Sequence, residues 1–424
     1  MRIRKSRKKI AREQLRKLKS VVTLAYAESD FYRKLYDENN FHPTQLKTLD
    51  DLPLIPVINR KMIQDAQARD PFALVPDSKR ATISWKQTTS GSTGLTITIY
   101  ASRIERLRIL QVILRGYRLN GLRFFDTSVT IKDPIDIARP NLVQKLGGFR
   151  HDYYDIYRPV EDIREAIADK WSKIDVLKGM PSDLANLAWL IHAKGLRFPP
   201  VNALFTDSEK LDEPTRKFIE RVFRTQALDF YATTEVGVVA FQTKKSNGCY
   251  HINDDSVLVE TRENSALDSD DHDLIVTGLV NFTTPIIRYQ IGDVVTPGNR
   301  QPVGDLPFST IQRIHGKYLD FIVGSDGRIV SSHAVKQNLT HLPGIRRFQV
   351  SQTGAAALKI LIAPDSNWTE EIAVEVLRLF KRDFGENMAI EIELDEELVN
   401  KSRDYKKFKV VESLVAQQLL SGQG

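Results

Sequence analysis

The sequence predicts an α/β protein in which a large N-terminal domain precedes a smaller α+β domain. Strand and helix patterns alternate from about residue 80 to 235, which favours a largely parallel sheet covered by helices. Short strands follow residue 250, and a compact group of helices and strands ends the chain. We expect a basic helical arm over 1–30, a large domain over 31–324 with α/β subdomains and a small β region, and a C-terminal domain over 325–424.

The alternating region contains helices with apolar residues at three- to four-residue spacing and strands rich in β-branched residues. Pro181 opens one of these helices and Gly195 ends it, as these two residue types commonly do. In chain order we expect a helix at 103–119, a strand at 126–132, helices at 161–174 and 182–194, a strand at 202–206, a helix at 211–224 and a strand at 227–231.

The region after residue 250 is dominated by short strands. Ser325-Asp326-Gly327-Arg328 is the type of turn that joins two strands tightly. We expect strands at 256–261, 273–279 and 286–289, a hairpin about 313–323, a helix at 333–342, strands at 346–352 and 357–363, a helix at 369–384 and a strand at 389–394.

The N-terminal arm concentrates the positive charge of the chain. The net charge is +7, but residues 1–19 hold ten basic side chains and one acid, so the remaining residues carry −2. This balance argues against nucleic-acid binding by the body of the protein. Apolar residues at helical spacing continue the arm, and three alternatives stay open for it: a solvated helix, docking on the large domain, or contact with an anionic membrane surface or a partner.

Composition is that of an ordinary globular protein, with 42% apolar and 27% charged residues. No apolar run approaches the roughly 20 residues that cross a bilayer, and the N-terminus lacks the apolar core of a secretory signal. We therefore expect a cytoplasmic protein, peripheral to the membrane at most. The single cysteine, Cys249, excludes an intramolecular disulfide and a cysteine-only metal site.

A hydroxyl-rich loop at 87–94 lies between two runs of β-branched residues. Its glycines allow backbone amides to turn toward one point, and its hydroxyls add neutral donors, which suits phosphate. The loop lacks the lysine of a Walker-type P-loop, and taken alone it is more commonly explained as a serine/threonine-rich surface turn. Its residues are Gln87, Thr88, Thr89, Ser90, Gly91, Ser92, Thr93 and Gly94.

Two further polar clusters follow predicted strands. They are Thr206-Asp207-Ser208-Glu209 and Thr233-Thr234-Glu235. Ligands of α/β proteins bind at the carboxyl ends of parallel strands, so the position of both clusters favours a ligand site.

Four motifs follow the hydroxyl-rich loop in order, and together with it they resemble the adenylate-forming acyl ligase superfamily. The chain is most similar to the phenylacetate-coenzyme A ligase branch and its relatives in capsular polysaccharide loci, and further similar segments lie at 31–36, 179–182 and 250–253. The motifs are Tyr231-Ala232-Thr233-Thr234-Glu235, Arg288-Tyr289-Gln290-Ile291-Gly292-Asp293, Gly316-Lys317-Tyr318-Leu319-Asp320 and Tyr405-Lys406-Lys407-Phe408.

The resemblance implies an enzyme that activates a carboxylic acid with ATP and Mg²⁺ as an acyl-adenylate and then passes the acyl group to coenzyme A or another thiol. It implies an adenylate-forming domain followed by a mobile C-terminal domain that swings about a hinge at Asp320. A second interpretation ends with transfer to an amine or hydroxyl in polysaccharide or secondary metabolism. A third is an inactive nucleotide-binding or membrane-associated homologue.

The resemblance also assigns roles in holding ATP. The loop at 88–94 would hold the β- and γ-phosphates. Tyr231, followed by Ala232 and Thr233, would stack on adenine, Thr234 would bond the α-phosphate, and Glu235 would hold Mg²⁺.

Other assignments carry explicit alternatives. Asp293 would accept both ribose hydroxyls or be a turn aspartate after glycine, and Arg288 would either contact phosphate or pair with a neighbouring acid. Ser208 and Glu209 would lie beside adenine or cap the helix that follows them. His251 would lie near the bound acid or be a structural histidine.

Four positions depart from the family pattern. Leu95 and Thr96 stand where relatives have lysine and proline, and Lys317 stands where they have arginine. Lys407 matches the C-terminal lysine that assists adenylation, but Lys406 replaces the glycine before it, and Lys409 is a competing assignment.

Overall fold

The computed structural model describes residues 6–88, 97–131, 150–154, 174–264, 267, 270–298, 304–317, 321–325, 329–331, 335, 339, 342–399, 411–413 and 415. The chain divides into two compact units. The first comprises Met1–Glu260, Ile275–Ile291 and Gly298–Arg313, and the second comprises Thr261–Leu274, Gly292–Pro297 and Ile314–Gly424. The second unit thus takes segments from before residue 324.

The N-terminal arm forms helix α1 (Arg7–Glu28), which docks on the first unit. Ser6 caps it by accepting from the backbone N–H of Lys9, and its apolar stripe is buried. Arg7 pairs with Asp254 over 2.7 Å, and Lys17 donates to the carbonyl of Asp255. Docking of the arm is therefore confirmed over the described residues, and a simple solvated helix is not observed. The buried residues of α1 are Ile10, Gln14, Leu18, Val21, Val22 and Ala25.

Short helices continue the chain from α1. They are α2 (Asp30–Glu38), the 3₁₀ turns Pro43–Gln45 and Leu49–Leu54, α3 (Arg60–Arg69) and α4 (Asp77–Arg80). None of the helices in the described ranges is both long and apolar enough to cross a membrane.

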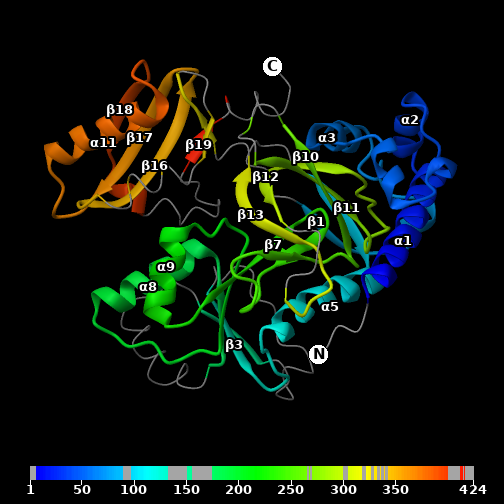
Figure 1. Cartoon of the computed structure of the whole chain (residues 1–424), viewed down its shortest axis with the longest axis horizontal. Helices are drawn as coiled ribbons and strands as arrows, with labels where there is room; N and C mark the ends of the chain where they lie inside the picture. The colour runs from blue at the N-terminus through cyan, green and yellow to red at the C-terminus, as the bar shows by residue number, and fades with distance from the viewer. Residues whose placement is uncertain are drawn as a thin grey trace. The chain divides into compact units, whose positions relative to one another are not determined.

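The main sheet of the described chain has eleven strands in the order β10-β11-β12-β13-β9-β8-β7-β6-β5-β3-β4 (Figure 1). The five strands β4, β3, β5, β6 and β7 are mutually parallel, whereas β8, β9 and β13 continue the sheet antiparallel. The predicted parallel sheet is thus confirmed for one side only. The strands are β3 (Thr127–Ile131), β4 (Arg150–Tyr154), β5 (Val176–Gly179), β6 (Ala203–Asp207), β7 (Ala227–Thr233), β8 (Gly237–Phe241), β9 (Tyr250–Ile252), β10 (Val257–Glu263), β11 (His272–Gly278), β12 (Tyr289–Pro297) and β13 (Thr310–Lys317).

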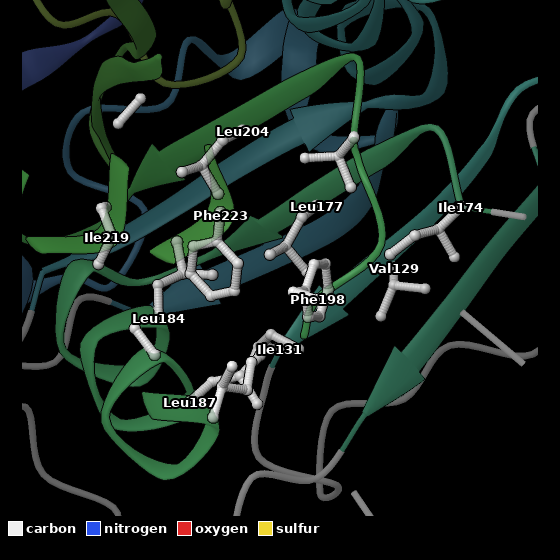
Figure 2. Packing of buried hydrophobic residues seen from close by; sticks show 14 of the residues in the cluster. Val129, Ile131, Ile174, Leu177, Leu184, Leu187, Phe198, Leu204, Ile219 and Phe223 are labelled. Carbon is white, nitrogen blue, oxygen red and sulfur yellow. The ribbon is translucent and has the colours of Figure 1, made fainter. Parts of the chain in front are cut away.

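Helices cover both faces of β5, β6 and β7, and each of these strands accordingly has buried apolar residues at consecutive positions, such as Leu204 and Phe205 in β6. On one face α8 (Pro181–Ala193) and α9 (Glu213–Phe223) pack against Leu177 and Leu204 (Figure 2). On the other face α5 (Arg103–Leu119) packs against Phe205 and Phe230. The predicted helices at 103–119, 182–194 and 211–224 are confirmed within two residues, and residues 161–173 of the remaining helix lie outside the described residues.

The C-terminal part of the second unit is a four-stranded sheet in the order β18-β17-β16-β19, with α11 (Glu370–Phe384) against it. Apolar residues of α11 such as Val376 and Phe380 pack on Val350 and Ile360 of the sheet. This confirms the α+β prediction. The strands are β16 (Ile345–Gly354), β17 (Ala357–Pro364), β18 (Ala389–Leu394) and β19 (Val411–Ser413).

Two strand predictions are wrong. The strand at 286–289 is absent, and β12 begins only at Tyr289 because Arg288 has a left-handed backbone with φ of 45°, which no strand residue adopts. The hairpin at 313–323 is also absent, since β13 pairs with β9 and β14 (Phe321–Val323) pairs with β15 (Ile329–Ser331). The pairing of Val323 with Ile329 shows that β14 and β15, on either side of the predicted turn, are antiparallel neighbours, while residues 326–328 of that turn lie outside the described residues.

Candidate functional site

The motif Tyr231–Glu235 spans the end of β7 and the turn that leads into β8. Thr233, at the end of β7, pairs with Gly237, whose φ of 82° is readily adopted only by glycine. The backbone N–H of Val236 donates to the Thr233 hydroxyl over 3.3 Å and closes the turn. Tyr231 and Thr234 are half-buried, so the turn presents their side chains where the parallel strands end, as predicted.

The carboxylate of Glu235 is buried beside two residues from other segments. The Tyr289 hydroxyl donates to its Oε1 over 3.2 Å, and a terminal nitrogen of Arg60 lies 3.7 Å from the same oxygen. Tyr289 belongs to the second predicted motif, so the fold brings the two motifs together. Arg60 was missed by the sequence analysis, because a contact between residues so far apart leaves no local pattern.

The start of α3 is held close to the start of β12. The backbone N–H of Ile58 donates to the Arg288 carbonyl over 3.0 Å, and the N–H of Gln290 donates to the Ile58 carbonyl over 2.9 Å. Asn59 then caps α3 by accepting from the N–H of Met62. These bonds fix the backbone two residues before Arg60 and account for its position beside Glu235.

Arg288 is a fully partnered buried cation. Its guanidinium donates to both carboxylate oxygens of Glu260, over 2.8 and 3.0 Å, and to the carbonyls of Pro53 and Ile55. Its backbone N–H donates to the Thr277 hydroxyl. Of the two alternatives for Arg288, pairing with a neighbouring acid is the one observed, and its predicted phosphate contact would require breaking these bonds.

The turn after β6 contains the two residues predicted beside adenine. Ser208 has a left-handed backbone with φ of 69°, and its hydroxyl donates to the Asp207 carboxylate over 2.7 Å. Asp212, not Ser208 or Glu209, caps α9 by accepting from the N–H of Thr215. The capping alternative is therefore wrong, and the nucleotide contact of Ser208 and Glu209 stays a prediction.

The hydroxyl-rich loop is framed by a hairpin. Thr88 ends β1 (Ile83–Thr88) and pairs with Thr98 at the start of β2 (Thr98–Ser102), and their hydroxyls lie 3.4 Å apart. The pairing agrees with the β-branched runs that flank the loop in the sequence. The predicted site residues Thr89, Ser90, Gly91, Ser92, Thr93 and Gly94 lie outside the described residues.

The remaining motif residues belong to the second unit. Asp293 is buried on β12, and Lys317 ends β13. Asp320 and Lys407 lie outside the described residues, as does Lys409. The roles of these four site residues stay predictions.

His251 is buried on β9. Its Nε2 lies 3.4 Å from the Thr243 hydroxyl, its ring lies 6.0 Å from that of Phe241, and its Nδ1 has no hydrogen-bond partner in the described part of the chain. Burial lowers the pKa of His251 to about 4, so the ring is neutral at physiological pH.

A buried acid beneath the Tyr231 turn was not singled out from the sequence. Asp229 of β7 accepts hydrogen bonds from the Thr206 hydroxyl over 2.5 Å and from the Tyr250 hydroxyl over 2.7 Å. Burial raises the pKa of Asp229 to about 6, although both hydrogen bonds act in the opposite direction. These hydrogen bonds connect β6, β7 and β9, and Asp229 lies in β7 two residues before Tyr231, a predicted nucleotide contact.

Solved structures identify the fold. A crystal structure of 2-hydroxyisobutyryl-CoA ligase in the postadenylation state, in complex with R3-HIB-AMP, matches with a TM-score of 0.74 at 17% identity and covers 97% of this chain and 91% of that one. The crystal structure of ATP-bound MatB from Rhodopseudomonas palustris matches with a TM-score of 0.52 at 13% identity. The match covers 80% of this chain and 67% of the MatB chain. The chain therefore has the fold of adenylate-forming acyl-CoA ligases.

Sequence comparison shows which branch of these ligases the chain is similar to. Protein CapK of Staphylococcus aureus is 33% identical over 138 residues, which are 32% of this chain and 29% of CapK. Phenylacetate-coenzyme A ligase of Thermus thermophilus is 23% identical over 314 residues, which are 68% of this chain and 66% of that ligase. The chain thus spans less than two thirds of either relative, and no family model matches it. These relatives confirm the resemblance to the CapK and phenylacetate-CoA ligase branch.

Proposed function

We propose that this chain uses ATP to activate a carboxylic acid as an acyl-adenylate and transfers the acyl group to coenzyme A or another thiol. The observation that carries the proposal is the contact between the Tyr231–Glu235 turn and Tyr289, which joins two separate nucleotide motifs in a fold shared with ligases solved with acyl-AMP or ATP. In the first step a carboxylate oxygen attacks the α-phosphorus and pyrophosphate leaves. In the second step a thiolate attacks the acyl carbon and AMP leaves.

The residues of the Tyr231 turn suit the binding of ATP. Tyr231 is half-buried and offers a ring for adenine, and Thr234 offers a hydroxyl for the α-phosphate. In this proposal Asp293 holds the ribose, and the donors of loop 88–94 stabilise the departing pyrophosphate. Lys407 would bring a cation to the reacting centre during adenylation.

Glu235 fits a magnesium ion bound together with ATP. Within the described ranges, the contacts of its carboxylate with Tyr289 and Arg60 both involve Oε1, which leaves Oε2 for a cation. The described residues contain no cluster of three or more metal-ligating side chains, and Mg²⁺ bound through one carboxylate and phosphate oxygens needs none. When bound, Mg²⁺ would neutralise phosphate charge.

Exchange of labelled pyrophosphate into ATP tests the proposed activation step. We expect exchange that depends on the added acid, in a panel of aliphatic, aromatic, hydroxy and dicarboxylic acids. If folded protein shows no exchange with any acid of the panel, the interpretation as an inactive nucleotide-binding homologue is favoured. That interpretation is based on Leu95 and Lys317, which depart from the family pattern.

A second candidate keeps the adenylation and changes the acceptor to an amine or hydroxyl in polysaccharide or secondary metabolism. The similarity to CapK in the aligned 138 residues is the observation that favours it. Product analysis separates the two candidates: a thioester formed with coenzyme A supports the first, and an amide or ester formed from supplied amines or sugars supports the second.

We further propose a cytoplasmic location with peripheral contact between α1 and an anionic membrane. The docked α1 keeps Lys8, Lys9, Arg12 and Arg16 on its exposed side. Such a cationic surface is attracted to anionic lipids.

A further inference from the structure

Lys178 is a half-buried cation of the first unit, and no acid is bonded to it within the described residues. It lies one residue before the end of β5, and its ammonium sits 4.6 Å from the ring centroid of Tyr117 on α5. Within the part of the chain that the structure describes, this ammonium makes no hydrogen bond or ion pair. Burial lowers the pKa of Lys178 to about 8, while the charge of Asp207 acts in the opposite direction, so the side chain stays largely protonated at neutral pH.

The surroundings of Lys178 combine aromatic and polar groups on one face of the sheet. In register with it stand Thr130 of β3 and Phe205 of β6, and Asp207 follows Phe205 on the same face, two residues further along β6. The ring of Tyr117 packs 4.6 Å from that of Phe205. The Lys178 ammonium therefore lies at the edge of a group of aromatic rings, among them Tyr117 of α5 and Phe205 of the sheet.

Packing alone does not account for this charge. The buried cation Arg288 has four acceptor contacts, whereas the half-buried Lys178 has a ring face and a carboxylate that is not within ion-pair distance. A half-buried ammonium without a hydrogen-bonded acceptor has lost part of its hydration, which an acidic group of a ligand would replace. Unusual cations of this kind near the ends of parallel strands are typical of ligand sites.

We propose that the ammonium of Lys178 binds a second acidic group on the carboxylic acid that is activated, so that the substrate is a dicarboxylate or a comparable doubly acidic acid. The proposal rests on the proposed function. Phe230 and Tyr231 are consecutive in β7 and point to opposite faces. Phe230 itself packs against Tyr117 of α5. Adenine stacked on Tyr231 would thus leave the opposite face at the strand ends, on the side of Lys178, for the body of the acid.

The sheet also sets the spacing of the two acidic groups. One strand, β6, separates β5 from β7, so Lys178 lies about 10 Å across the sheet from the Tyr231 strand. The adenylated carboxyl and the group bound by Lys178 therefore belong to opposite ends of the acid, and the aromatic rings would contact the carbons between them.

The test compares pairs of monocarboxylic and dicarboxylic acids of equal chain length in ATP–pyrophosphate exchange. We expect the wild type to favour the diacid by about tenfold or more in kcat/KM, and K178M to lose most of that preference through a higher KM for the diacid. Exchange with the monoacid should be unchanged in K178M. The matched control is K217M, which removes an exposed lysine paired with Glu213 on α9 and should leave both acids unaffected.

The outcomes separate this inference from the proposed function. A wild type that favours the monoacid, or a K178M variant that slows both acids equally, overturns the role of Lys178 and leaves adenylation standing. No exchange with any acid counts against the proposed function itself. In that case the shift in Tm that the diacid causes tests the binding site of Lys178. A shift in the wild type that is lost in K178M supports the site. A shift that is absent in the wild type, or equal in wild type and K178M, overturns it.

Discussion

Tyr289 donates a hydrogen bond to Glu235 across 54 positions of sequence, over 3.2 Å and out of contact with bulk solvent. The contact joins the turn after β7 to the first residue of β12. Because it uses only Oε1 of the carboxylate, it orients Glu235 without occupying both oxygens. The hydrogen bond thus restrains the Glu235 side chain and leaves Oε2 for a ligand.

Glu235→Gln should lower the rate of adenylation by about tenfold or more and raise the Mg²⁺ concentration needed for half-maximal exchange, since an amide is a poorer ligand than a carboxylate. Exchange measured across a Mg²⁺ titration checks this. Tyr289→Phe is the matched control, because it removes the hydrogen bond and keeps the carboxylate, so its Mg²⁺ requirement should change less. Equal Mg²⁺ requirements in wild type and E235Q would remove Glu235 from the metal site.

Lys407→Ala should suppress adenylation and leave transfer from a supplied acyl-adenylate largely intact, because a cation at the α-phosphate is needed only while ATP reacts. Pyrophosphate exchange measures the first half-reaction and thioester formation from acyl-adenylate measures the second. Lys409→Ala is the comparison. If K409A shows the separation of half-reactions and K407A does not, the catalytic lysine is Lys409.

Helix and strand positions in the first unit were largely predictable, because local periodicity and caps such as Ser102 before α5 determine them. The start of β12 could not be predicted in this way, because it depends on the backbone conformation of Arg288. Hydrogen bonds with Thr277 and Ile58, which are distant in sequence, hold that backbone. Similarly, motifs identified Glu235 and Tyr289 separately, but neither Arg60 beside them nor the unpaired charge of Lys178 leaves a trace in local sequence.

Arg288→Met should destabilise the first unit by about 3–5 kcal/mol, because it leaves the carboxylate of Glu260 in a largely buried position without its cation. Denaturant unfolding followed by a probe in the first unit measures the change. Lys34→Met removes the exposed pair with Glu38 and should cost no more than about 1 kcal/mol. A weaker affinity for ATP in R288M without loss of stability would restore the phosphate-binding alternative.

Stability should respond to pH through His251 and Asp229 in opposite directions. The pKa of His251 is lowered to about 4, so its contribution is complete above pH 6.5 and is lost as the pH falls toward 4, where only the unfolded chain takes up the proton. The pKa of Asp229 is raised to about 6, so its contribution is lost as the pH rises from about 4 to 6.

Unfolding free energies of His251→Gln and Asp229→Asn, measured from pH 4 to 7.5, check these signs. H251Q should lose less stability than the wild type as the medium becomes acidic. D229N should gain stability relative to the wild type as the pH rises toward 6. A wild-type slope that neither variant alters would show that other groups control the pH dependence.

Arg12→Glu together with Arg16→Glu should reduce binding to anionic vesicles by about tenfold or more, because each basic residue near such a surface contributes about 1 kcal/mol. Both side chains lie on the exposed side of α1, so folding and adenylation should be unchanged. Deletion of residues 1–12 is a poorer test, since it also removes buried Ile10 and the bond from Arg7 to Asp254. Co-sedimentation with phosphatidylserine vesicles at low and high salt measures the effect, with Lys217→Glu as the control. Binding that is equal in the double variant and the control would exclude α1 as the membrane contact.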